Sequence, residues 1–196
     1  EQIDAAAETG DASLVTVSTL YQAARLVGEA VREVRRLDGP ALEANNGVFA
    51  CSFILGGQIH GEPPRMFQIY AEGNFIEASF DTPFFQIGEH KYGKPILDRV
   101  MRPDMRLTEA AKLVLLSYDS TLRSNLSVGM PIDLLMYERD SLEISYQRRI
   151  SQNDPYFEKL SKGWSGALRE AFKNIDNYRE PSSTEATDTI TPRDLS

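Results

Sequence analysis

Short apolar segments and longer helical patterns alternate in blocks along this chain, and the order of these blocks limits the folds open to it. Residues 48–79 have the pattern of a meander of about four short strands separated by turns, and residues 132–146 have the pattern of a hairpin. Helical patterns precede, separate and follow the two blocks. This order is typical of α+β proteins with sheet in the middle and helices outside. We therefore expect a layered α+β fold.

The expected helices are marked by apolar residues at three- and four-residue spacing. In the first, residues 18–36, Leu20, Ala24 and Val31 share one face, and Asp38-Gly39-Pro40 is expected to end it. Residues 1–8 are rich in alanine and have the composition of the end of an earlier helix. The other helices are expected around residues 94–101, from Thr108 onward and from Asp154-Pro155 onward.

The strands are expected from β-branched and aromatic runs bounded by turn residues. In order, the elements of the meander are residues 48–55, the turn Gly56-Gly57, residues 58–60, residues 65–71, the turn Glu72-Gly73-Asn74 and residues 75–79. The hairpin consists of residues 132–137 and 142–146. A further apolar run, residues 84–87, has the place of a strand before Gly88. Because no Lys or Ser/Thr completes a phosphate-binding motif at Gly56-Gly57, we interpret this pair as a tight hairpin turn.

One helix is apolar nearly all the way round. Leu113, Val114, Leu115 and Leu116 follow one another in the helix that begins near Thr108. An apolar surface of this width predicts burial on more than one side. The helix is expected to lie between a sheet and either a second helical layer or a neighbouring subunit.

Composition indicates one globular domain and a tail. The chain of 196 residues is 41% hydrophobic, which is ordinary for a single compact domain, and we assign residues 1–178 to it. Residues 179–196 are rich in Ser, Thr, Pro, Asp and Glu, so we expect a disordered tail. No run approaches the roughly 18 to 20 apolar residues of a membrane span. We expect a cytoplasmic protein without membrane contact.

Charge argues against nucleic acid as a partner. The net charge is -8, and acidic and basic residues are mixed along the chain. The basic cluster of Arg32, Arg35 and Arg36 shares its helix with Glu29 and Glu33, so we expect ion pairs on a solvated helix face.

Metal and thiol chemistry find little support in the sequence. The single cysteine, Cys51, lies in a β-rich run and is expected to be a small buried hydrophobe and not a nucleophile. His60 and His90 have no Cys, His or paired carboxylate at ligand spacing. We expect no metal site and no cofactor.

Three long segments of this chain resemble the Anbu family, bacterial relatives of the proteasome β-subunit. They are NFIEA at residues 74–78, FQIGEHKYGKPILDR at residues 85–99 and STLRSNLSVGMPID at residues 120–133. The resemblance implies a four-layer αββα sandwich of the N-terminal nucleophile hydrolase type. It also implies a peptidase that acts on peptides or unfolded proteins and assembles as a ring-like or split-ring homo-oligomer. In that superfamily the first residue, Thr, Ser or Cys, is the nucleophile and its free α-amine is the general base.

The chain departs from this pattern at its start. Glu1 cannot serve as a hydroxyl or thiol nucleophile, and the family's first strands, with the Lys and Asp of the site, have no counterpart here. The resemblance therefore implies that roughly 50 to 60 residues, with the nucleophile among them, lie outside the printed sequence.

Five residues of this chain match places that border the site in the superfamily. Gly88-Glu89 takes the place of a serine in a glycine-rich turn, so only the Gly88 backbone is expected to support catalysis there. Asn125 and Ser127 take the place of a supporting Asp and Ser, and Asn125 lacks the charge. Glu89 and His90 are expected to shape peptide binding. Plain structural roles stay open for Asn125 and Ser127, as a polar turn, and for Gly88, as a turn with positive φ.

Three functions remain open from the sequence. The first is the peptidase subunit, with its nucleophile outside the printed residues. The second is a non-catalytic, ring-forming scaffold or peptide-binding protein with a degenerate site, which Gly88 and Asn125 favour. The third is an unrelated α+β domain that begins at Glu1.

Overall fold

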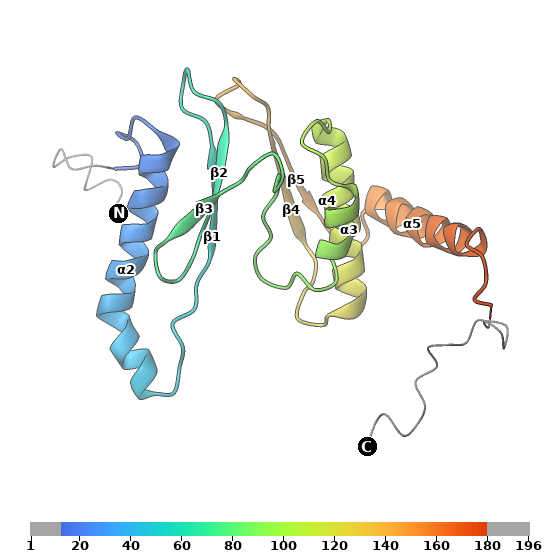
Figure 1. Ribbon diagram of the computed structural model, residues 1–196, viewed down its shortest axis with the longest axis horizontal. Helices are drawn as coiled ribbons and strands as arrows, with labels where there is room; N and C mark the ends of the chain where they lie inside the picture. The colour runs from blue at the N-terminus through green and yellow to red at the C-terminus, as the bar shows by residue number, and fades with distance from the viewer. Residues whose placement is uncertain (1–12, 180–196) are drawn as a thin grey trace, which may run out of the picture.

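The computed structural model describes residues 13–179 and contains two antiparallel sheets between helices (Figure 1). The first sheet has the strand order β1 (Phe53–Gly57), β2 (Arg65–Ile69), β3 (Phe75–Glu77), and the second pairs β4 (Ile132–Tyr137) with β5 (Ile144–Ile150). The helices are α2 (Leu20–Ala44), α3 (Lys94–Val100), α4 (Leu107–Ser124) and α5 (Pro155–Lys173). The helix expected at residues 1–8 and the tail expected at residues 179–196, apart from residue 179 itself, lie outside the described residues.

The elements are stacked in layers, as the order of the sequence blocks predicts. Figure 1 shows α2 beside the first sheet, the second sheet next to it, and α3 and α4 beyond, with α5 projecting from that end. α2 packs on β2, and α4 packs on β4, α3 and α5. The expected α+β fold with helices outside two sheets is therefore confirmed.

The first sheet is held to α2 by an apolar cluster. Phe67 of β2 is 1% exposed and packs with Leu20, Ala23 and Ala24 of the helix. Tyr21 meets the Phe67 ring edge-on at a centroid distance of 6.4 Å. The apolar stripe predicted for this helix is thus the face that the sheet covers.

The prediction that α2 ends at Asp38-Gly39-Pro40 is wrong, because the helix continues to Ala44 with Pro40 inside it. A proline ring fixes φ near the helical value, so the chain can stay helical at Pro40. The ring also removes one hydrogen-bond donor and crowds the preceding turn, which weakens the helix there without ending it. The expected ion pairs on this helix are confirmed by Arg36 and Glu33, whose Nη2 and Oε1 atoms lie 2.6 Å apart.

Several predictions for the strands and their turns differ from the structure. Gly56 and Gly57 belong to β1, where they pair with Met66 and Arg65, and do not form a turn. Residues 58–60 are not a strand, and the Gln58 side chain donates to the Glu62 carbonyl oxygen and to Asp140 Oδ1. Residues 48–52 and 84–87 also lack strand structure, so neither Phe49 nor Phe85 lies in a sheet, whereas Ile69 lies in β2.

The leucine run of α4 is buried within this chain. Leu113 and Leu115 are each 2% exposed, and Leu115 packs with Ile132, Ile150 and Phe157 of the second sheet and α5. α3 lies on another side of α4. The expected burial on more than one side is therefore confirmed, and a sheet and further helices provide it without a neighbouring subunit.

Several element ends match the sequence signals, and the starts of α4 and β5 shift by one or two residues. β4 has the predicted bounds, and Asp154 caps α5 by accepting a hydrogen bond from the Phe157 N–H at 3.0 Å. α4 begins at Leu107 with Arg106 at its N-cap, and not at Thr108. β5 begins at Ile144, because Asp140 and Leu142 have positive φ and prolong the turn.

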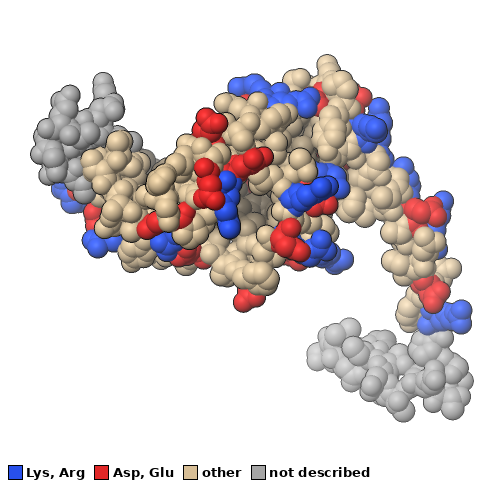
Figure 2. All heavy atoms as spheres, turned by 90° about the horizontal axis from the view of Figure 1, so that it is seen from above, with Lys and Arg blue, Asp and Glu red and all other residues tan. Residues whose placement is uncertain are grey.

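Charges of both signs are interleaved over the face drawn in Figure 2. No segment of single sign dominates this face, which agrees with the mixed pattern of the sequence. Within residues 13–179, none of the helices is long and apolar enough to cross a membrane.

Candidate functional site

Residues 84–91, which we call the Gly88 loop, connect the first sheet to α3. Gly88 has a φ of +77°, which confirms the expected turn conformation, and an added Cβ there would have open space around it. A glycine is required at this position by the backbone, because L side chains rarely adopt such a φ. Three of the five candidate residues, Gly88, Glu89 and His90, belong to this loop, which lies beside the C-terminal end of α4.

Glu89 in this loop contacts the turn that follows α4. The Asn125 Nδ2 atom donates a hydrogen bond of 2.6 Å to Glu89 Oε2. Asn125 Oδ1 accepts bonds from the backbone N–H of Ser127 at 2.7 Å and from Ser127 Oγ at 2.6 Å. The Lys91 N–H donates to the other carboxylate oxygen, Glu89 Oε1, at 2.9 Å. Residues 36 positions apart thus form one hydrogen-bonded chain.

The polar groups of this chain differ in exposure. Glu89 and Asn125 are half-buried, whereas Ser127 is exposed. The pKa of the Glu89 carboxyl is lowered, mainly because the Lys91 N–H binds the ionised form, with smaller contributions from the Lys91 charge and the Asn125 amide; partial burial opposes the shift. Glu89 is therefore ionised at neutral pH and acts only as a hydrogen-bond acceptor.

His90 points away from this hydrogen-bonded chain. Its Nδ1 atom lies 3.1 Å from the Gly88 carbonyl oxygen, and its side chain is exposed and lines a neighbouring pocket. The structure thus joins Glu89, Asn125 and Ser127 directly, with Gly88 next to them in the backbone, and places His90 on another side of the loop.

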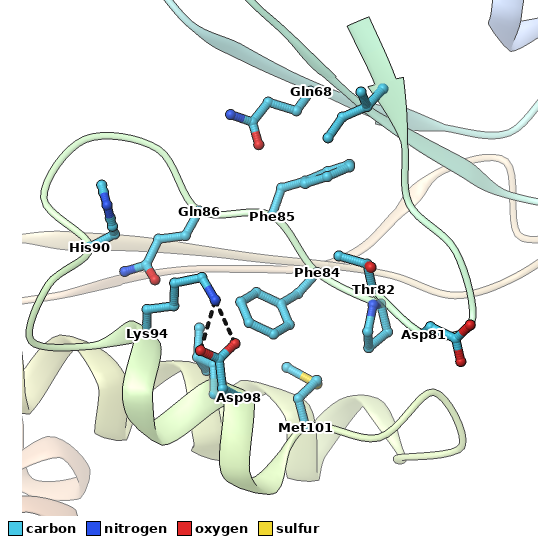
Figure 3. A pocket seen from close by; sticks show the side chains of 13 residues that line it. Gln68, Asp81, Thr82, Phe84, Phe85, Gln86, His90, Lys94, Asp98 and Met101 are labelled. Carbon is cyan, nitrogen blue, oxygen red and sulfur yellow. Dashed lines mark hydrogen bonds and ion pairs between the residues drawn. The ribbon is translucent and has the colours of Figure 1, made fainter.

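The pocket that His90 lines has a volume of about 430 Å³ and lies between the first sheet, the Gly88 loop and α3 (Figure 3). Gln68 of β2 and Phe84 of the loop border it, and on α3 Lys94 pairs with Asp98 one turn further along, with both Nζ to Oδ distances at 2.7 Å. The Lys94 amine also lies 5.7 Å from the centre of the Phe84 ring. Asp98 offsets the charge of Lys94, and the pocket also presents the amides of Gln68 and Gln86, aromatic rings and the Asp81 carboxylate.

Two further hollows border the same loop. One, of about 310 Å³, is lined by Glu89 and by Val114 and Tyr118 of α4. The other, of about 490 Å³, is lined by Gly88 and by Cys51 on the opposite side of the loop. The Gly88 loop therefore separates three recesses, and the Glu89 carboxylate faces the recess beside α4.

The residues Gln68, Gln86, Lys94 and Asp98 were not among the candidates from the sequence. The i, i+4 spacing of Lys94 and Asp98 predicts an ion pair on a helix, but it does not predict a pocket. Gln86 Oε1 is buried without a hydrogen-bond partner in the described residues. Cys51, expected to be buried, is half-buried. Within residues 13–179, no three His, Cys, Asp or Glu side chains lie close enough to hold a metal ion.

The chain matches a known protein family over more than half its length. Residues 25–135 match the family model described as proteasome subunit. No curated protein matches the chain.

Solved structures of Anbu proteins are similar to this chain in both sequence and fold. A Gly-1 mutant of Anbu from Hyphomicrobium sp. strain MC1 is 63% identical, with a TM-score of 0.80 over 86% of this chain and 70% of that one. Anbu from Yersinia bercovieri, named there as ancestral beta-subunit, is 48% identical, with a TM-score of 0.80 over 87% of this chain and 70% of that one.

A third structure, the helical assembly of the Anbu complex from Pseudomonas aeruginosa, is 45% identical and has a TM-score of 0.83 over 94% of this chain and 75% of that one. The layered arrangement described above is thus a proteasome-type α+β fold of the N-terminal nucleophile hydrolase kind. The interpretation as an unrelated domain is wrong. The chain belongs to the proteasome subunit family and, within it, to the Anbu family.

Proposed function

We propose that the complete protein is a peptidase that hydrolyses peptide bonds of peptides or unfolded proteins through an N-terminal Thr, Ser or Cys. The observation that carries this proposal is the hydrogen-bonded chain of Glu89, Asn125 and Ser127, which joins two elements far apart in the sequence beside three recesses. This link fixes the Gly88 loop against the end of α4, where the resemblance places the groups that support the nucleophile.

In this proposal the nucleophile is not one of the printed residues. Its hydroxyl or thiol attacks the peptide carbonyl, its own α-amine takes the proton and returns it to the leaving amine, and water then hydrolyses the acyl enzyme. The exposed hydroxyl of Ser127 would lie beside that amine, and the backbone of Gly88 would border the bound peptide. Glu89 and His90 would face the peptide from the Gly88 loop.

We further propose that the protein works as a homo-oligomer, in a ring-like, split-ring or helical arrangement. Support comes from the family and from the Pseudomonas aeruginosa relative, whose structure is described as a helical assembly. Support also comes from α5, which projects from the layers and leaves Leu168 and Phe172 exposed (Figure 1).

Peptide cleavage by the complete protein tests the proposal. Incubation with a library of fluorogenic peptides should show turnover, and Ser127→Ala should lower kcat/KM by about tenfold or more, because a group that binds the reacting centre is lost. His60→Ala, an exposed residue away from the three recesses, serves as the control and should leave kcat/KM unchanged. Absence of cleavage by the wild-type protein would contradict the peptidase function.

The second candidate is a non-catalytic scaffold or peptide-binding subunit. The observation that favours it is the lack of a hydroxyl at Gly88 and of a charge at Asn125. Under this function the complete protein would bind peptides, as fluorescence anisotropy would detect, and would leave them uncleaved.

A further inference from the structure

The hydrogen-bonded chain of Glu89, Asn125 and Ser127 has a direction. Every donor in it points toward Glu89: the Asn125 amide donates to the carboxylate at 2.6 Å, and Ser127 Oγ donates to the Asn125 carbonyl oxygen at 2.6 Å. The Lys91 N–H occupies the other carboxylate oxygen at 2.9 Å. Because a carboxylate can only accept, it decides which end of the Asn125 amide faces it and therefore which end faces Ser127.

The orientation of Asn125 fixes the role of the Ser127 hydroxyl. Its proton is used in the bond to Asn125 Oδ1, so the lone pairs of the exposed Oγ atom remain for a donor that approaches from outside. Hydrogen bonds in such a chain polarise one another, and an ionised acceptor at its end strengthens them.

We propose that Glu89 is a positioning residue, which holds Asn125 so that Ser127 presents its hydroxyl lone pairs to an ammonium or N–H donor of the site. The inference rests on the proposed function, in which that donor is the amine of the nucleophile or the N–H of a peptide. It adds a second role to the place of Glu89 beside the peptide, namely the support of Asn125 and Ser127.

The geometry explains why a glutamine would not replace Glu89. In Glu89→Gln, one of the two oxygens becomes an NH₂ group, yet both face donors, the Lys91 N–H and the Asn125 amide. Either one contact is lost, or Asn125 turns round and points its NH₂ group at Ser127. If Asn125 turns, the hydroxyl of Ser127 loses its present orientation; if Asn125 stays, the glutamine gives up the bond from the Lys91 N–H or the bond from the Asn125 amide, so Asn125 is held less firmly.

Exchange of the two groups should restore the chain. In the double variant Glu89→Gln with Asn125→Asp, the glutamine oxygen accepts from Lys91 and its NH₂ group donates to Asp, which still accepts both bonds from Ser127. The single variant Asn125→Asp instead brings two carboxylates together at the 2.6 Å contact, and like charges repel there. In the wild-type protein and the double variant, every group of the chain thus has a matching hydrogen-bond partner, and in each single variant one contact lacks its match.

The experiment is a double-mutant cycle on the complete protein, with the melting temperature and kcat/KM as separate measurements. Each single variant should lower Tm by about 2–4 °C, and the double variant should return to within about 1 °C of the wild type. The kcat/KM should fall about tenfold in Glu89→Gln and recover at least half of that loss in the double variant. Glu29→Gln, in an exposed pair with Arg25, is the matched control and should leave both quantities unchanged.

The two measurements separate the inference from the proposed function. Additive losses of Tm in the double variant would overturn the inference, whether or not the protein cleaves peptides. A second outcome would also overturn the inference: the protein is active and the double variant recovers its Tm, but its kcat/KM stays as low as in Glu89→Gln. The Glu89–Asn125 pair would then have a structural role only. A coupled Tm cycle in a protein without any cleavage would remove the proposed peptidase function and leave the Glu89–Asn125 pair standing.

Discussion

Gly28 in α2 and Gly73 in the turn between β2 and β3 allow the first helix to approach the first sheet backbone to backbone. A Cβ atom added to Gly28 would collide with the Gly73 carbonyl, and Gly73 has a φ of +74°, which strains an L side chain. Arg32 Nη1 donates to the same carbonyl at 2.9 Å and holds the contact closed. The close contact at the two glycines therefore fixes the position of the first sheet, which borders the candidate site, against α2.

Gly28→Ala should lower the free energy of unfolding by about 1–3 kcal/mol, because neither backbone can move away without loss of the Arg32 bond. Urea denaturation of the complete protein measures this change. The control is Gly163→Ala on α5, where an added Cβ has no neighbour within 4 Å and should stabilise by up to about 1 kcal/mol through helix propensity. An unchanged unfolding midpoint in Gly28→Ala would show that the contact is looser than described.

The pair of Arg65 and Glu77 joins β2 to β3 through two bonds, Nε to Oε1 at 2.6 Å and Nη2 to Oε2 at 2.7 Å. These bonds lower the pKa of Glu77 below its ordinary value of 4.5, with the hydrogen bonds to Arg65 as the main cause. The folded pKa is the lower one, so the stabilisation is present above pH 4.5 and is lost as pH falls through the folded value.

Glu77→Gln should therefore lower Tm at neutral pH, and its difference from the wild type should shrink as the pH falls below 4.5. The loss at neutral pH should be less than about 1 kcal/mol, because the pair is partly exposed to solvent. Melting curves from pH 7 to acid measure it. A difference that grows toward acid would reverse the assigned sign.

At the scale of elements, the patterns of neighbouring residues predicted those helix and strand boundaries that neighbouring residues determine. The apolar run of residues 132–137, bounded by turn residues, and the Asp154-Pro155 pair were sufficient for β4 and the start of α5. Tertiary context decided the rest: α2 continues through Pro40, and residues 84–87 form a loop although they are apolar.

The candidate site shows the same division. The resemblance pointed to Gly88, Glu89, Asn125 and Ser127, but no spacing rule predicts that Glu89 and Asn125, 36 positions apart, share a hydrogen bond. The separation of His90 from this chain was equally unpredictable, because it depends on how the Gly88 loop turns.

At the scale of the whole molecule, α5 is a helix that residues 13–179 leave largely uncovered, with Phe157 as its buried residue. It projects from the layers in Figure 1, and beyond the buried Phe157 its outer half exposes Leu168 and Phe172, the latter at 76%. Ile175 and Tyr178 follow and are also exposed. Apolar residues in such a position are typical of a contact between copies of a chain.

Phe172→Asp should therefore weaken self-association of the complete protein, because a charge would be buried in the contact. Light scattering coupled to size exclusion should show a smaller particle than the wild type at equal concentration. Lys159→Ala, an exposed residue on the inner half of the same helix and on the face opposite Leu168, is the control and should leave the particle size unchanged. An assembly of wild-type size in Phe172→Asp would mean that α5 lies outside the contact.

The central claim, that the Gly88 loop and Asn125 serve an N-terminal nucleophile, is tested most directly by covalent labelling of the complete protein with a hydroxyl- and thiol-directed peptide probe. We predict that mass spectrometry finds one adduct, on the first residue of the mature chain, and that Asn125→Ala slows its formation by about tenfold or more. Labelling elsewhere, no labelling, or an unchanged rate in Asn125→Ala would contradict the account.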